Sequence, residues 1–156
     1  MNGRTYSVIF NAVATTAAVD LFELLPADDK PIEIIGIELG QTTEFGDAQD
    51  ETLGLQIIRG FTASGSGGSA ATPTPISPNA SAAGFTAEVN NTTLANTGTT
   101  TTLLSTAFNV RAGYINYFPI DARPGCSQGN TSIVVRMTAP ADSVTLNGTL
   151  IVRELA

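Results

Sequence analysis

The sequence contains no histidine and no tryptophan, and its only cysteine is Cys126. Histidine is the commonest general base, the usual activator of a serine or cysteine nucleophile and a frequent zinc ligand, so most hydrolase and zinc-site arrangements are excluded. A single cysteine cannot form a disulfide within the chain, and Cys126 lies in the turn-rich segment 122–130, where we expect an inert thiol. These absences predict a protein that is not an enzyme and needs no cofactor.

Charge is also scarce in this chain. Charged residues make up 13% of it, and Lys30 with six arginines opposes fourteen carboxylates, for a formal net charge of −7. Nothing here suggests a basic surface for nucleic acid or an anionic membrane, so neither is an expected partner. No apolar run approaches the ~18 residues of a membrane span, and the N-terminal MNGRTYSVIF lacks the features of a signal peptide. The sequence therefore predicts synthesis in a cytoplasm without export by a signal peptide.

The chain does contain many apolar residues that alternate with polar ones. Tyr6, Val8 and Phe10 form one such set, and further sets occur in 53–57, 104–110, 133–137 and 144–152. Alternation with period two indicates half-buried strands, and no segment has the 3.6-residue period of an amphipathic helix. About eight to ten short strands joined by turns predict an all-β protein, a single antiparallel β-sandwich domain over residues 1–156 with a jelly-roll-like topology.

Residues 32–39 break this alternation, because apolar side chains stand at positions 32, 34, 35, 37 and 39. The change of phase predicts either a β-bulge or a strand that is covered on both faces. A strand with two apolar faces would carry more hydrophobic surface than one thin sandwich can bury. Together with the low charge density of the chain, this pattern predicts a homo-oligomer, and a homotrimer is the arrangement that we expect.

Residues 60–93 are the longest stretch with little strand pattern, although 84–89 could form a short strand. Glycine and serine at 64–69 indicate a flexible patch, and the three prolines at 73–78 indicate an extended, polyproline-like chain. A long irregular segment in a compact domain is usually functional or disordered, so the segment is either a surface linker or an arm that contacts a neighbouring subunit. The candidate interface residues are Arg59, Thr72, Pro73, Thr74, Pro75, Ile76 and Pro78.

The densest acidic group consists of Glu44, Asp47, Asp50 and Glu51. A carboxylate pair could hydrolyse a glycosidic bond, but aromatic residues are only 6% of the chain and offer few platforms for a sugar. The same oxygens could bind Ca²⁺, yet their spacing does not match the calcium-loop pattern. We therefore expect a solvated loop and no metal site, with these four carboxylates as the only candidates for one.

Two further groups of residues are interpreted as structural. Arg136 and Arg153 stand at solvent-face positions of strands, where they would cover a sheet face or pair with another subunit. Tyr114, Tyr117 and Phe118 lie in an alternating strand and are interpreted as core residues. That interpretation argues against a sugar-binding surface, which usually displays exposed aromatic rings.

Four segments carry a resemblance to a known family, in the order LGLQIIRGFTASGSGGSAATPTPISP, AAGFTAEVNNTT, AFNVRAGY and APADSVTLNGTLIVREL. They resemble small proteins encoded among the head genes of tailed bacteriophages and prophages, including capsid decoration, or cement, proteins. The similarity extends from residue 6 to residue 155. Its most specific parts are Arg59 and Gly60 with the Gly/Ser/Pro-rich stretch that follows, and the turn 140–143.

The resemblance implies a structural virion protein that binds the outer surface of a phage capsid and stabilises it. Its partners would then be the major capsid protein and other copies of itself in a trimer. It would be made in the cytoplasm of the host bacterium and located on the capsid exterior. The alternative is a non-enzymatic recognition module, such as the receptor- or carbohydrate-binding jelly-roll head of a tail or fibre protein.

Overall fold

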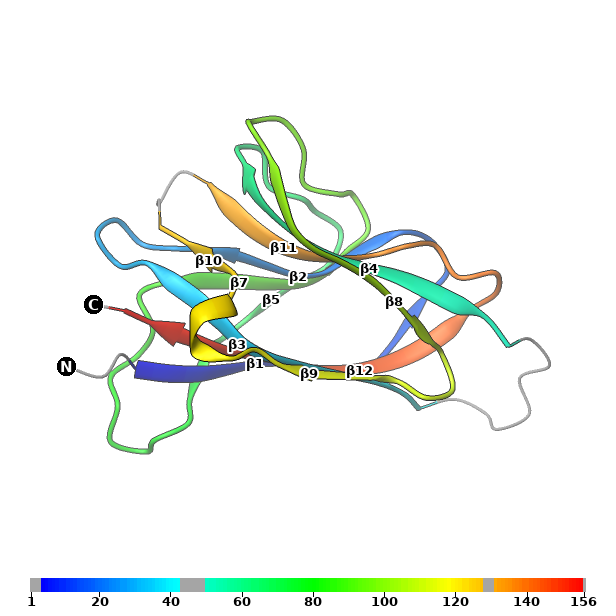
Figure 1. The fold of residues 1–156 in the computed structure, drawn as a ribbon, viewed down its shortest axis with the longest axis horizontal. Helices are drawn as coiled ribbons and strands as arrows, with labels where there is room; N and C mark the ends of the chain where they lie inside the picture. The colour runs from blue at the N-terminus through cyan, green and yellow to red at the C-terminus, as the bar shows by residue number, and fades with distance from the viewer. Residues whose placement is uncertain (1–3, 43–49, 128–130, 156) are drawn as a thin grey trace.

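Two β-sheets face each other in this computed structural model, which describes residues 4–42, 50–127 and 131–155. In Figure 1 the sheets form two layers, and the chain enters and leaves at the same end of the molecule. All strand pairings in both sheets are antiparallel. The predicted all-β fold and antiparallel sandwich are therefore confirmed, while the finer jelly-roll topology stays a prediction.

Sheet A has the strand order β10-β3-β12-β1-β6, with β9 also paired to β3, and sheet B has the order β5-β7-β2-β11-β4-β8. One short 3₁₀ turn, η1, lies between β9 and β10. The elements are β1 (Arg4–Thr15), β2 (Val19–Leu25), β3 (Ile32–Gln41), β4 (Thr52–Phe61), β5 (Ser69–Ala71), β6 (Thr74–Pro75), β7 (Thr86–Asn91), β8 (Thr101–Asn109), β9 (Tyr114–Tyr117), η1 (Ile120–Ala122), β10 (Gly125–Cys126), β11 (Ser132–Met137) and β12 (Val144–Glu154).

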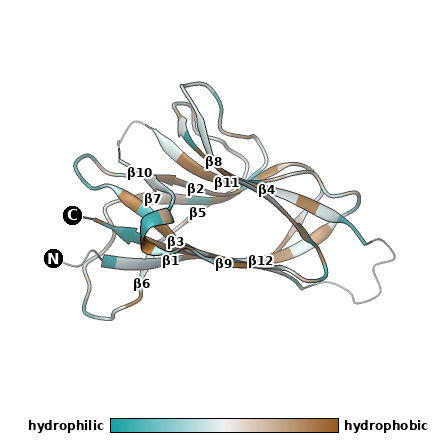
Figure 2. Cartoon of the chain, viewed as in Figure 1, coloured by the Kyte–Doolittle hydropathy of each residue, from teal (hydrophilic) through white to brown (hydrophobic). Residues whose placement is uncertain are grey.

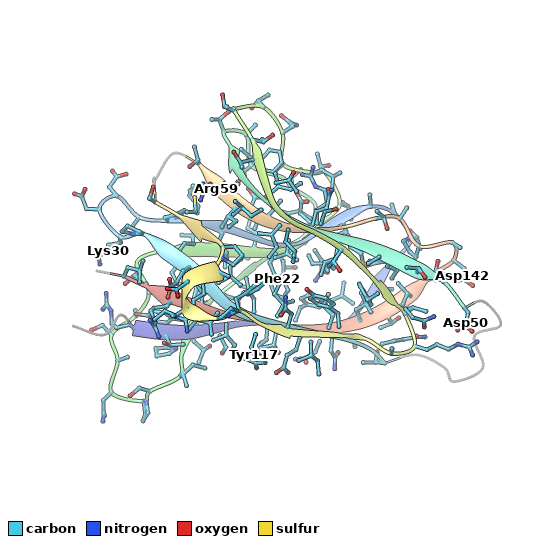
Figure 3. All side chains as sticks on the ribbon, viewed as in Figure 1. Phe22, Lys30, Asp50, Arg59, Tyr117 and Asp142 are labelled. Atoms are coloured by element: carbon cyan, nitrogen blue, oxygen red, sulfur yellow. The ribbon has the colours of Figure 1, made fainter. Side chains whose placement is uncertain are left out.

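The core lies between the two sheets and is built from the alternating residues. Tyr6, Val8 and Phe10 of β1 all point inward, as their spacing predicts. Phe10 packs against Phe22 of β2 with ring centroids 5.3 Å apart, so the two sheets meet through aromatic contact. Figure 3 shows Phe22 between the layers, and Figure 2 shows the hydrophobic colouring along the strands that enclose it.

The irregular pattern in β3 is a β-bulge. Its partner β12 shifts register between Ile151, opposite Gly36, and Val152, opposite Ile34, so Ile35 is an extra residue. The bulge lets residues on both sides of it point into the core, and only Ile35 among the apolar residues of this strand is left half-buried. The surplus hydrophobic surface inferred for this strand does not exist, so that argument for a trimer is wrong.

The segment 60–93 is not one unstructured loop. It contains β5 and β7, which extend sheet B, and β6, which pairs with β1 of sheet A. The short strand suggested for 84–89 is present as β7. Cys126 also differs from expectation, because it lies on β10 as a buried core residue and not in a loop.

Gly148 of β12 provides a test of how tightly the core is packed. A Cβ atom at this position would stand 2.3 Å from Cε1 of the buried Phe10 ring, whereas a Cβ at Gly40 of β3 would meet nothing within 4 Å. We expect Gly148→Ala to lower the free energy of unfolding by about 1–3 kcal/mol, the usual cost of overpacking. The matched control Gly40→Ala should change it by less than about 0.5 kcal/mol. Urea unfolding measures both, and equal effects would contradict this account of the core.

Candidate interaction surfaces

The outer face of sheet A, which points away from the core, carries large exposed apolar side chains. Ile9 of β1 and Ile115 of β9 are 52% and 73% exposed, and they lie in one cross-strand row through Thr149 and Glu38. Tyr117 belongs to the next row and is 53% exposed. The outer face of sheet A therefore carries exposed apolar side chains at both of its sides, with Thr149 and Glu38 between them.

Tyr117 lies flat on this face because the residue opposite it is glycine. A Cβ atom at Gly36 would come within 2.6 Å of Cδ1 of the Tyr117 ring, so any larger residue would displace the ring. The Tyr117 hydroxyl donates a 2.5 Å hydrogen bond to Oε1 of Glu38. This hydrogen bond favours the neutral phenol and raises the pKa of Tyr117 above its usual value. Figure 3 shows Tyr117 on the side of sheet A away from Phe22.

Tyr114, Tyr117 and Phe118 were all expected in the core, and for Tyr117 this is wrong. Tyr114 and Phe118 do pack against the core, with Tyr114 stacking near Phe108 at a centroid distance of 5.9 Å. Tyr117 has the opposite phase of the same strand and therefore faces solvent. Its exposed ring removes one of the reasons given against a sugar-binding surface.

The candidate interface residues of 72–78 lie beside this same face. Thr74 and Pro75 pair with Ser7 and Tyr6 of β1, and the Ile76 backbone N–H donates to the Thr5 carbonyl at 2.9 Å. By the alternation of a strand, Ile76 shares the outer face with Thr74, and its side chain is 56% exposed. The segment thus binds its own sheet edge and adds one more apolar side chain to the outer face.

The arginines at one end of the outer face are paired within the chain. Arg123 Nη1 lies 2.7 Å and Arg153 Nη1 lies 3.4 Å from Oε1 of Glu33, so one carboxylate holds two guanidinium groups. Arg59, another candidate interface residue, donates from Nη1 to the Gly125 carbonyl at 2.9 Å and so links β4 of sheet B to β10 of sheet A. These charges form a polar end beside the apolar surface.

The outer face of sheet B is covered by the chain itself. Residues 62–66 and 93–97 form a two-stranded ribbon, here called the cover ribbon, through the bridges Ala63–Asn96 and Ser66–Thr93. Ala95 of the ribbon packs with Ile58, Phe61 and Val134 in a second apolar cluster, separate from the main core. The central part of this face is therefore buried without any partner.

A buried ion pair holds one strand of the cover ribbon. Asp20 is fully buried, and its two carboxylate oxygens accept hydrogen bonds from Nε and Nη2 of Arg136 at 2.6 and 3.1 Å. The Ala95 backbone N–H donates to Asp20 at 2.8 Å, and its carbonyl accepts from Arg136 at 2.8 Å. The Arg136 guanidinium also lies 4.8 Å from the centre of the Phe61 ring. The expectation that Arg136 faces solvent is wrong.

The other strand of the cover ribbon is held by an amide and a carboxylate. Glu23 is buried, and its Oε2 accepts hydrogen bonds from the Gly65 backbone N–H and from Nδ2 of Asn91, both at 3.0 Å. Gly65 and Gly68 pass so close to the backbone of β7 and its continuation that a Cβ on either would stand within 2.5 Å of a carbonyl oxygen. The Gly/Ser-rich patch predicted to be flexible is therefore glycine-rich because its backbone packs closely.

The acidic group is only partly within the described residues, since Glu44 and Asp47 lie outside them. Asp50 forms an exposed ion pair with Nε of Arg111 at 3.0 Å, and Glu51 accepts a hydrogen bond from the Ala141 backbone N–H at 2.6 Å. Among the described residues, no group of three or more potential ligands is arranged to hold a metal ion. Asp50 and Glu51 thus each bind a residue of a neighbouring turn, Arg111 and Ala141.

Asp20, Glu23 and Asn91 were not singled out from the sequence, although one signal was available. In the run VDLFELL the acidic residues stand at positions 20 and 23, inside a strand that is otherwise apolar. Charges in such a strand are rarely buried unless they are paired, so they indicate a polar network under a second layer. The partners themselves are distant in the sequence and could not have been identified.

The ion pair under the cover ribbon yields a stability prediction. Arg136→Met keeps the side-chain volume but leaves the Asp20 carboxylate buried with one backbone donor, and losing one partner of a buried pair costs about 3–5 kcal/mol. Arg111→Met removes the exposed Asp50 pair and should cost less than about 1 kcal/mol. Thermal and urea unfolding compare the two. A loss for Arg136→Met no greater than that for Arg111→Met would show that the pair does not hold the ribbon.

Comparison with known proteins identifies no family for this chain. No protein-family model and no curated protein matches it. A structure described as the T13 viral particle of IBDV aligns at 13% identity and a TM-score of 0.26, over 100% of this chain and 40% of the other. Infectious bursal virus-derived T=1 particles align at 13% identity and a TM-score of 0.12, with 38% of that chain covered. The chain thus spans about two fifths of their length, and such low scores carry no functional argument.

Among the described residues, no helix meets the length and hydropathy needed to cross a bilayer.

Proposed function

We propose that this chain is a structural, non-enzymatic virion protein that binds the outer surface of a phage capsid and stabilises it. The observation that carries the proposal is the group of exposed apolar side chains on the outer face of sheet A. Ile9 and Ile76 lie at the β1 side of this face, and Ile115 and Tyr117 lie on β9, across the intervening strands β12 and β3. Isolated apolar residues on a surface are ordinary, but a group that spans a sheet is typical of a protein interface. The resemblance of the sequence to phage head proteins supplies the partner.

The surroundings of this face support protein binding. An apolar centre with a polar edge is the usual anatomy of an interface, and here the edge is formed by Glu33, Arg123 and Arg153. The segment 72–78 lies along one side of the face and could extend the contact area. A capsid decoration protein needs no turnover, because many bound copies stabilise the assembled shell by mass action.

A homotrimer remains part of the proposal. The reason is the avidity of three linked binding sites, and not an excess of hydrophobic surface on β3. Three copies held together bind a capsid three-fold position with three sets of contacts, which multiplies a modest affinity for each. The protein would be made in the bacterial host cytoplasm and located on the capsid exterior. No cofactor, nucleic acid or membrane has a part in this function.

The second candidate function is a non-enzymatic recognition module for carbohydrate. One observation favours it: Tyr117 presents an exposed ring with Glu38 hydrogen-bonded to its hydroxyl. Stacking on an aromatic ring beside a carboxylate is a common way to hold a sugar. This candidate predicts that Tyr117→Ala abolishes glycan binding and leaves capsid stability unchanged.

The capsid proposal is tested with heads assembled with and without the protein. Adding purified protein to undecorated heads should raise the temperature at which DNA is released. Ile115→Asp places a charge at the most exposed apolar position and should weaken binding to heads at least about tenfold, or ~1.4 kcal/mol.

The control is Ala107→Asp, which introduces the same charge at an exposed position of β8 in sheet B. Binding by this variant should match that of the parent. An unchanged release temperature at saturating occupancy would refute the stabilising role. Equal binding by the two aspartate variants would instead assign the contact to another face.

A further inference from the structure

A groove of about 660 Å³ opens between the two sheets, on the side away from the proposed polar edge of the outer face. One wall is β1 from Ile9 to Thr15, and the other is β5 with its flanking residues 67–72. Buried side chains, Phe10, Val19 and Val89, form its floor. The groove therefore lies where the sandwich is not closed by a strand.

Both walls are strand edges with an unpaired side. Beyond Ser7, the ladder of β1 in the described chain has β12 as its only partner, because β6 pairs with Tyr6 and Ser7 alone. On the opposite wall, β5 pairs with β7 and with no other strand of the described residues. A strand edge carries backbone donors and acceptors that can pair with another extended chain, and proteins usually cover or charge such an edge. Within the described part of the chain, the residues that line the groove are all uncharged.

The groove is also lined by Asn90, whose side-chain amide is buried. Asn90 is 7% exposed, and neither Oδ1 nor Nδ2 has a hydrogen-bond partner among the described residues. Buried polar atoms are nearly always paired, so an amide with both atoms unpaired requires an explanation. Its backbone has a φ of 58°, a region that asparagine tolerates better than most residues and that glycine adopts readily.

An amide side chain and a peptide group have matching chemistry. The asparagine amide offers two N–H donors and one carbonyl acceptor, and a peptide group offers one of each. Both polar atoms of Asn90 are buried in the open groove, so the side chain must turn toward the groove to hold an extended chain with two hydrogen bonds. The uncharged lining disfavours charged peptides and phosphorylated ligands. A sugar is also disfavoured, because the one aromatic ring in the groove, that of Phe10, is buried in its floor.

We propose that this groove binds an extended, uncharged peptide segment of a partner protein, which adds as a strand to the edge of β1 and pairs with the Asn90 amide. This is recognition by β-strand addition, in which the backbone supplies affinity and alternate small side chains supply fit. The proposal does not depend on capsid binding, because it rests on the unpaired strand edges and on Asn90 and concerns any partner that presents such a segment.

The test uses a displayed library of random twelve-residue peptides, selected on the purified full chain. Selection should enrich uncharged sequences, and the enriched peptides are then titrated against variants. Ala14→Trp and Thr16→Trp each place a large ring at an exposed position of the groove and should weaken binding at least tenfold. Ala112→Trp introduces the same ring in an exposed turn outside the groove and should leave binding unchanged.

Asn90→Gly separates a binding role from a structural one. Glycine keeps the positive φ and removes the amide, so peptide affinity should fall at least tenfold while the unfolding temperature stays equal or rises. A lower unfolding temperature would show that the amide serves the fold and would overturn its assignment to the ligand.

Two other outcomes would also overturn the proposal. One is that no peptide is retained, or that retained peptides bind the Ala14→Trp variant as well as the parent. The other is self-association of the parent that Ala14→Trp abolishes in sedimentation experiments, which would assign the groove to a second copy of this chain.

Discussion

The burial of alternate side chains between two sheets is the constraint on which the rest of this structure depends. It gives each sheet an inner face that must be apolar and an outer face that can be exposed to solvent, covered by the chain or bound by a partner. This chain treats its two outer faces differently, because the cover ribbon buries the centre of sheet B while sheet A keeps Ile9, Ile115 and Tyr117 exposed. The face that the chain leaves uncovered is the one with surface to offer another protein.

The cover ribbon explains why a chain with so few charges buries several of them. An all-apolar contact would let the ribbon slide over sheet B, since hydrophobic attraction has little directional preference. Asp20 accepts a hydrogen bond from the Ala95 backbone N–H, and Arg136 donates one to the Ala95 carbonyl. Glu23 accepts one from the Gly65 backbone N–H, so both strands of the ribbon are fixed in position. The net stabilisation from a buried pair is small after desolvation, so its main contribution is to specify one arrangement. That arrangement in turn sets where the chain returns to form β5 and the groove.

The sequence predicted features that depend on local periodicity, and it failed where distant segments meet. The inward set Tyr6, Val8 and Phe10 follows from spacing alone, because a strand has a fixed two-residue repeat. The change of phase in β3 predicted either a bulge or a strand covered on both faces, and the register of β12 shows the bulge. The cover ribbon could not be predicted in this way. A segment rich in glycine and serine has the same composition whether it is a flexible linker or a backbone packed closely against another. Tyr117 was misassigned although its spacing was informative, because it has the opposite phase to Tyr114 and Phe118 and cannot share their core-facing side of the strand.

The outer face of sheet A and the groove share one residue. Ile9 lies on the outer face of β1 and also lines the groove beside that strand, so a ligand at either surface would cover part of the same side chain. Two separate partners would compete for Ile9, whereas one partner that covers the face and extends a segment into the groove would bury it once. In the second case the segment is tethered beside its site, so its ordering adds little further loss of freedom. If one partner contacts both surfaces, the shared strand β1 lets it cover the outer face and place an extended arm in the groove beside the same strand.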